Sequence, residues 1–250
     1  MGLVIAVAGK GGVGKSTLAA ILVNLLAERA GEVVLAVDAD PNANLWEKLG
    51  MRLENTIGQL REDMLRNADD LPTSMSKPEY VRYQIRLALQ EGERFDMLTM
   101  GRSEGPGCYC YINSILRTFL DSMMDDYPFV VIDNEAGMEH LSRRTTRRMD
   151  LLLVVSDATK TGVETAVRIR DLAREMEVEV IREVLIINRS PKELHPAVKQ
   201  AIASSGFQEV IHIPEDRRVE ELAIVGEPLA GLDRTSPAYR TLRGLVSGLI

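Results

Sequence analysis

The chain has 250 residues and carries 30 lysines and arginines against 37 aspartates and glutamates, a formal net charge of -7 at neutral pH. Its 45% of apolar and 27% of charged residues are ordinary for a globular protein and exclude a disordered chain. The acidic balance argues against a sequence-independent nucleic-acid surface, which needs a basic stripe, so we expect no nucleic-acid partner.

Seven short apolar runs, rich in β-branched residues, alternate with longer helix-like stretches. The runs cover residues 3–7, 33–37, 97–100, 129–132, 151–155, 184–187 and 210–213. They lack polar alternation, which is typical of strands buried on both faces. Good helix formers fill residues 16–29, and Gly31 is placed to end that helix.

This alternation predicts an α/β fold: a doubly wound, mostly parallel sheet of seven to eight strands with helices on both faces. We expect a single domain over residues 1–250. The polar, breaker-rich segment 67–77 predicts a surface loop, and the weakly amphipathic segment 239–250 predicts a packing helix.

Chemically notable residues follow five of the predicted strands. These segments are residues 9–16, Asp38 with Asp40, residues 101–110, residues 133–137, and Asn188. Because ligands of such sheets bind at the carboxyl ends of the strands, we expect all five segments to meet at one edge.

The first of these segments is a phosphate-binding loop. Residues 9–16 satisfy the Walker A pattern G-x-x-x-x-G-K-[ST], in which glycines let backbone amides turn toward phosphates. Lys15 supplies charge for the β- and γ-phosphates, and the Ser16 hydroxyl is a ligand for Mg²⁺. The predicted contacts to ATP or ADP are Gly9, Lys10, Gly11, Gly12, Val13, Gly14, Lys15, Ser16 and Thr17.

The lysine after the first glycine makes this loop distinctive. The segment from Lys10 to Thr17 resembles the deviant Walker A motif of the MinD, ParA and nitrogenase-iron-protein class of dimeric ATPases. The resemblance implies that Lys10 crosses to the nucleotide of a partner subunit and neutralises charge in the transition state. It implies that the protein is an ATPase that forms a homodimer.

The same class has counterparts for other segments of this sequence. The resemblance implies that Asp40 orients the attacking water and lies with Ser16 beside magnesium, and that Asp38 belongs to the same network. Asp133 matches the Walker B aspartate, and Asn188 matches an asparagine that contacts adenine. The loop that borders the base corresponds to Pro214, Glu215 and Asp216.

Both cysteines of the chain lie in one Cys-x-Cys segment, Cys108 and Cys110. Two thiolates are too few for a closed tetrahedral metal site, but a symmetric dimer would bring four together. By ligand softness, such a shared site suits zinc, nickel or an iron–sulfur cluster.

Three features together resemble one branch of the class, the CooC-type nickel-insertion ATPases. They are the deviant loop, the Cys-x-Cys segment, and the Ala-Gly-Met-Glu-His segment at residues 136–140. The resemblance implies that Cys108 and Cys110 hold Ni²⁺ or Zn²⁺ across the dimer. It also implies a nickel client, carbon monoxide dehydrogenase or acetyl-CoA synthase. Asn134 departs from some members, which have methionine after the Walker B aspartate.

Two other functions remain open. A MinD- or ParA-type positioning ATPase would share the loop, but it would leave the Cys-x-Cys segment unexplained. An iron–sulfur ATPase that donates electrons would need cluster cysteines far apart in sequence, and no cysteine follows Cys110.

The remaining sequence features concern location. No apolar run approaches the ~18 residues of a membrane span. The first strand begins too early for a leader peptide. Two cysteines are not a disulfide framework. We therefore expect a cytoplasmic protein with no membrane partner.

Overall fold

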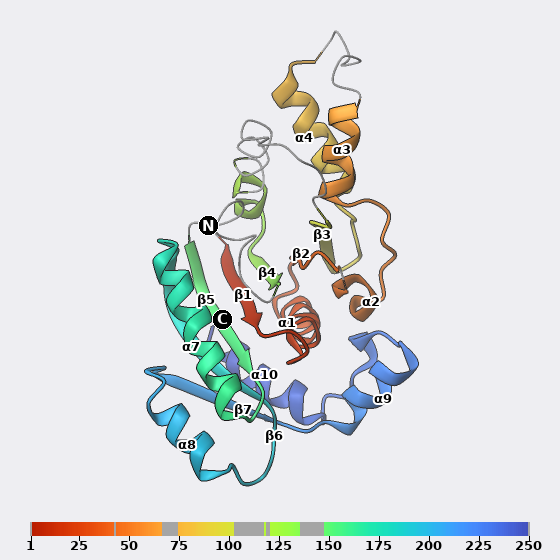
Figure 1. Ribbon diagram of the computed structural model, residues 1–250. Coiled ribbons are helices and arrows are strands. Elements are labelled where there is room, and N and C mark those ends of the chain that lie inside the picture. The colour runs from red at the N-terminus through yellow and green to blue at the C-terminus, as the bar shows by residue number, and fades with distance from the viewer. Residues whose placement is uncertain are drawn as a thin grey trace.

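A computed structural model describes residues 2–42, 44–66, 75–102, 118, 121–135 and 148–249. In this part of the chain, seven parallel strands form one sheet in the order β3-β2-β4-β1-β5-β6-β7 (Figure 1). The strands are β1 Leu3–Gly9, β2 Val34–Ala39, β3 Phe95–Thr99, β4 Phe129–Asn134, β5 Arg148–Ser156, β6 Glu179–Ser190 and β7 Glu209–Pro214. This confirms the predicted fold class, with seven strands, all of them parallel.

Helices cover both faces of the sheet. They are α1 Lys15–Ala30, α2 Leu45–Leu49, α3 Ile57–Arg66, α4 Lys77–Ala88, α7 Lys160–Glu175, α8 Pro196–Ala203, α9 Arg217–Val225 and α10 Pro237–Ser247, with a 3-10 turn at Leu229–Gly231. One apolar core lies between the sheet and α1 with α10, and the other lies between the sheet and α4, α7 and α8. The central strands are therefore buried on both faces, as their continuous apolar runs predict.

The helix after the first strand begins and ends as its sequence predicts. α1 starts directly after Gly14, and Gly31 ends it in the left-handed conformation with φ 64°. Glycine is favoured there because a side chain would clash with the backbone carbonyl. The short βα connection places the amino end of α1 at the carboxyl edge of the sheet.

The structure describes part of each of two predicted segments nearer the surface. Of the predicted loop 67–77, residues 67–74 lie outside the described residues, while Ser76 caps α4 in a capping box with Glu79. The predicted packing helix is α10, which buries one face that includes Leu242 and Val246. Among the described helices, none has the length and apolar character needed to cross a membrane.

Candidate functional site

The parallel strands bring the sequence-predicted residues to one edge of the sheet. Gly9 ends β1, Asp38 lies near the end of β2, Asp133 near the end of β4, and Asn188 near the end of β6. Asp38 and Asp133 are register partners on adjacent strands. Gly101 follows β3 at the same edge, but the segments 103–110 and 136–137 lie outside the described residues.

Two positions of the phosphate loop need glycine because other residues lie too close for a side chain. Gly9 has a φ of 155°, and a Cβ there would lie 2.3 Å from the carbonyl oxygen of Val155 on the neighbouring strand. Gly14 has a φ of 99°, and its Cβ would lie 2.5 Å from Nδ2 of Asn188. A side chain at Gly9 would push the loop away from the backbone of β5, and one at Gly14 would displace the Asn188 amide that lies against the loop. The glycine pattern is therefore a consequence of how tightly β5 and β6 hold this loop.

The start of α1 offers positive potential to an anion. Gly14 provides no side-chain cap, and the first turn contains no acidic residue, so the first amides of α1 are open to a ligand. The Lys15 side chain is buried, and its ammonium donates to the carbonyl oxygen of Lys10 at 3.4 Å. No other described residue accepts a hydrogen bond from this ammonium, and a buried ammonium of this kind suits a phosphate oxygen.

Asp38 organises the loop after β2. It is fully buried, and its two carboxylate oxygens accept hydrogen bonds from the amides of Asp40 at 3.1 Å and Leu45 at 2.9 Å. Burial raises the pKa of Asp38 to about 6, although these two amides lower it. Asp40 is half-buried and accepts from the amide of Asn42 at 2.9 Å. Asp38 therefore fixes the backbone that carries Asp40.

Asp133 is fully buried, and neither of its carboxylate oxygens has a hydrogen bond of ordinary geometry to a described residue. Burial raises its pKa to about 7. The Ser16 hydroxyl and the Lys15 ammonium lower that value, and the charge of Asp38 adds to the rise. A buried carboxylate with so little hydrogen bonding needs a proton or a cation. Oxygen ligands of this kind are those that Mg²⁺ and its bound water prefer, so the residues present fit magnesium.

Two further polar groups lie at this edge: Thr99, which sequence reasoning missed, and Asn134, which it placed in the segment 133–137 without assigning it a role. Thr99, the last residue of β3, has a buried hydroxyl without a partner among the described residues. Asn134 donates from Nδ2 to the carbonyl oxygen of Val7 at 3.1 Å, while its Oδ1 is buried and unpaired within the described part. Their positions at the ends of two predicted strands were the sequence signal that could have assigned them to the site. Asn134 therefore ties β4 to β1 immediately before the phosphate loop.

The two predicted base-contact regions have clear structural partners. Asn188 donates from Nδ2 to the carbonyl oxygen of Val13 at 2.7 Å, so its side chain lies against the phosphate loop. Pro214 ends β7 and Glu215 follows it. The Asp216 carboxylate caps α9 and accepts from the amide of Ala238 at the start of α10. Contacts of Asn188, Pro214, Glu215 and Asp216 with a base stay predictions.

The predicted metal-binding thiols, Cys108 and Cys110, lie outside the described residues. Where the chain is described, no group of three or more histidine, cysteine, aspartate or glutamate side chains could hold a metal ion. The magnesium ligand set predicted here is smaller, because water and phosphate oxygens supply the remaining positions.

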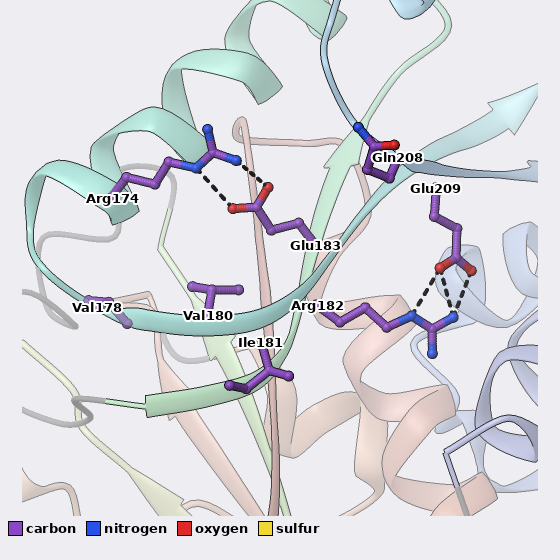
Figure 2. A pocket seen from close by; sticks show the side chains of 8 residues that line it. All are labelled: Arg174, Val178, Val180, Ile181, Arg182, Glu183, Gln208 and Glu209. Carbon is purple, nitrogen blue, oxygen red and sulfur yellow. Dashed lines mark hydrogen bonds and ion pairs between the residues drawn. The ribbon is translucent and has the colours of Figure 1, made fainter.

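A separate pocket of about 460 Å³ lies where β6 and β7 begin, at the edge opposite the phosphate loop. Figure 2 shows its two arginines facing glutamates: Arg174 pairs with Glu183 at 2.8 Å, and Arg182 pairs with Glu209 at 2.7 Å. Because both guanidinium groups are already paired, this pocket offers no free charge to a phosphate. The nucleotide site is therefore expected at the other edge.

Comparisons with known proteins agree with this geometry. A profile of the CobQ/CobB/MinD/ParA nucleotide binding domain matches residues 4–229. An uncharacterized ATP-binding protein of Methanocaldococcus jannaschii is 39% identical over 250 residues, 99% of this chain and 98% of that protein. The carbon monoxide dehydrogenase accessory protein CooC of Rhodospirillum rubrum is 32% identical over 201 residues, 76% of each chain.

A solved structure has the same architecture. The septum site-determining protein MinD of Pyrococcus horikoshii, complexed with Mg-ADP, matches with a TM-score of 0.68 at 19% identity, over 100% of this chain and 96% of its own. At that identity the match establishes the fold, whereas the profile spans most of the sequence and includes the phosphate loop. The chain belongs to the CobQ/CobB/MinD/ParA family of nucleotide-binding domains.

Proposed function

We propose that this protein is a magnesium-dependent ATPase, a single domain that works in the cytoplasm and hydrolyses ATP to ADP and phosphate. The observation that carries the proposal is the fully buried carboxylate of Asp133 beside the phosphate loop, which accepts no hydrogen bond of ordinary geometry from a described residue. Burying a carboxylate in this way costs free energy, and proteins retain such a group where it holds a cation or a reacting water. The Mg-ADP bound to the similar MinD structure supports the same assignment.

In this proposal the residues at the edge divide the work of binding and hydrolysis. Lys15 and the first amides of α1 hold the phosphates, while Ser16 and Asp40 hold Mg²⁺, which screens the charge of the triphosphate. Asp38 fixes the loop of Asp40, which orients the attacking water. Lys10 is exposed, so its side chain is available to a second subunit, where it would stabilise the charge that develops during hydrolysis.

We further propose that ATP hydrolysis drives a nickel chaperone. The similarity to CooC, whose name gives it as an accessory protein of carbon monoxide dehydrogenase, supports this function, as does the Cys-x-Cys segment. Cys108 and Cys110 from two subunits would bind Ni²⁺ or Zn²⁺ as cargo. Closure of the dimer on ATP assembles four thiolates and raises metal affinity, and hydrolysis releases the metal to carbon monoxide dehydrogenase or acetyl-CoA synthase.

Metal content tests this proposal directly. Protein purified without oxygen and loaded with nickel is separated into monomer and dimer, with and without nucleotide, and its metal is measured per subunit. About half an equivalent, confined to the dimer, is expected for a site with four thiolates from two subunits. Exchange of Cys108 and Cys110 for serine should remove the metal and leave nucleotide binding intact. Unchanged metal content in that variant would contradict the shared site.

A positioning ATPase is the second candidate, and the family and fold favour it as much as they favour a chaperone. In that case the dimer would bind no metal, while ATP-dependent dimerisation and hydrolysis would persist. Metal-free dimers of full ATPase activity would therefore favour positioning over metal delivery.

A further inference from the structure

The strand that carries Asn188 is irregular at its carboxyl end. Ile187 pairs with His212 and Ser190 pairs with Pro214, so Asn188 and Arg189 on β6 stand opposite the single residue Ile213 on β7. Two residues against one define a β-bulge. Within it, Arg189 has a φ of 51°, a left-handed conformation that residues other than glycine, asparagine and aspartate rarely adopt.

The bulge directs two successive side chains to the same loop. In a regular strand, neighbouring side chains point to opposite faces of the sheet. Here Asn188 donates to the carbonyl oxygen of Val13 at 2.7 Å, and Arg189 donates to that of Gly12 at 2.8 Å. Bulges next to active sites often re-aim side chains in this way. The irregularity therefore serves the phosphate loop, which is 175 to 177 positions away in sequence.

The two hydrogen bonds fix the orientation of two peptide planes. In a trans peptide the carbonyl of one residue and the amide of the next point in opposite directions. Holding the carbonyls of Gly12 and Val13 against β6 therefore turns the amides of Val13 and Gly14 away from β6. These amides belong to the set that a phosphate loop presents to its ligand.

We propose that Arg189 is a positioning residue that holds the phosphate loop in its nucleotide-binding conformation before nucleotide arrives. The inference rests on the proposed function and adds a residue to it. Glycine would adopt the left-handed backbone here without strain, so the presence of arginine is explained by the hydrogen bond from its guanidinium group to Gly12. Pre-organisation of this kind raises affinity because less ordering remains to be done on binding.

The test exploits that backbone conformation. Arg189→Gly removes the guanidinium group but suits the positive φ, Arg189→Lys keeps a donor, and Arg182→Gln serves as a control in the same strand. Arg182 pairs with Glu209 at the far end of β6. The dissociation constant of Mg-ADP is measured by calorimetry, and the melting temperature of each variant is measured without nucleotide.

We expect Arg189→Gly to weaken Mg-ADP about tenfold, the effect of one lost hydrogen bond from a charged group, without lowering the melting temperature. Arg189→Lys should recover part of the affinity, and Arg182→Gln should bind as the unaltered protein does. Equal affinity in Arg189→Gly would overturn the inference, as would a parallel loss of melting temperature. If the unaltered protein itself does not bind Mg-ADP, the proposed function fails instead.

Discussion

Among the described residues, Asp133 shows most clearly a charge that the folded state disfavours. It has no exposure to water and no donor of ordinary geometry within the described part, and burial raises its pKa to about 7. The folded protein therefore binds a proton at this carboxyl over a pH range in which the unfolded chain, with an ordinary aspartate pKa near 3.8, does not. Stability contributed by this protonation is present at low pH and is lost as the pH rises toward 7.

We expect Asp133→Asn to raise the stability of the nucleotide-free protein above pH 7, because the amide removes a charge that the folded state buries. The gain should be at least about 1 kcal/mol, which is roughly 2–4 °C in melting temperature at this chain length. Between pH 5 and 8 the melting temperature of the unaltered protein should fall, and that of the variant should fall less, since Asp38 still titrates.

Exchange of the exposed Asp125 for asparagine is the control, and it should leave the change of melting temperature with pH as it is in the unaltered protein. The variant Asp133→Asn should also lose the additional stabilisation that Mg²⁺ gives to the ADP complex. If the melting temperature of Asp133→Asn falls with pH as steeply as that of the unaltered protein, burial of the Asp133 charge does not cause the fall.

At the scale of elements, Asp216 connects the start of two helices. Its Oδ1 accepts from the amides of Arg218 and Val219 in α9, and its Oδ2 accepts from the amide of Ala238 and the hydroxyl of Ser236 at the start of α10. One buried carboxylate thus satisfies amides at two helix amino termini. α10 is held in place by the hydrogen bonds to Asp216 and by its own buried apolar face.

Asp216→Ala should therefore lower the free energy of unfolding by about 2 kcal/mol or more, because both caps are lost at once. Urea unfolding followed by circular dichroism measures this as a lower midpoint with an unchanged slope. The control is Asp233→Ala, since Asp233 is a nearby exposed aspartate that accepts from the amide of Thr235 at 2.7 Å. Its loss should be smaller. Equal midpoints for the two variants would show that the double cap has no special weight.

The strands and α1 could be predicted because local chemistry determines them. Each of the seven apolar runs forms a strand, and the phosphate loop begins where the glycine pattern places it. The bounds of β6 were less accurate, Glu179–Ser190 against the predicted 184–187, because its first five residues mix charged with apolar side chains and are only partly buried. The contact of Arg189 with Gly12 could not be predicted, because it depends on a bulge set by pairing with β7.

At the scale of the whole molecule, the phosphate loop presents one lysine, Lys10, to the surface and keeps the other, Lys15, buried. The Lys10 side chain is exposed, and no hydrogen bond or ion pair joins it to any described residue. Lys15, in contrast, is buried within its own subunit. A charge that serves catalysis needs a fixed position near the transferred group, which Lys10 lacks in one isolated subunit. A second copy of the chain would supply that position through a symmetric contact.

Subunit mixing distinguishes a lysine that acts across the dimer from one that acts within its own subunit. We expect Lys10→Ala and Asp40→Ala each to abolish ATP hydrolysis while nucleotide binding remains. In a mixed dimer, the subunit that carries Lys10→Ala keeps its own Asp40 and receives Lys10 from its partner. One of its two sites is then complete, and the other lacks both residues.

Random pairing of equal amounts makes half of the dimers mixed, so the mixture should recover about a quarter of the unaltered turnover, measured as phosphate release. The recovery should depend on protein concentration, because it requires exchange of subunits. Mixing either variant with protein that carries both exchanges is the control, and it should recover nothing. If the equal mixture stays inactive although mixed dimers are demonstrated by differential tagging, Lys10 acts on the nucleotide of its own subunit.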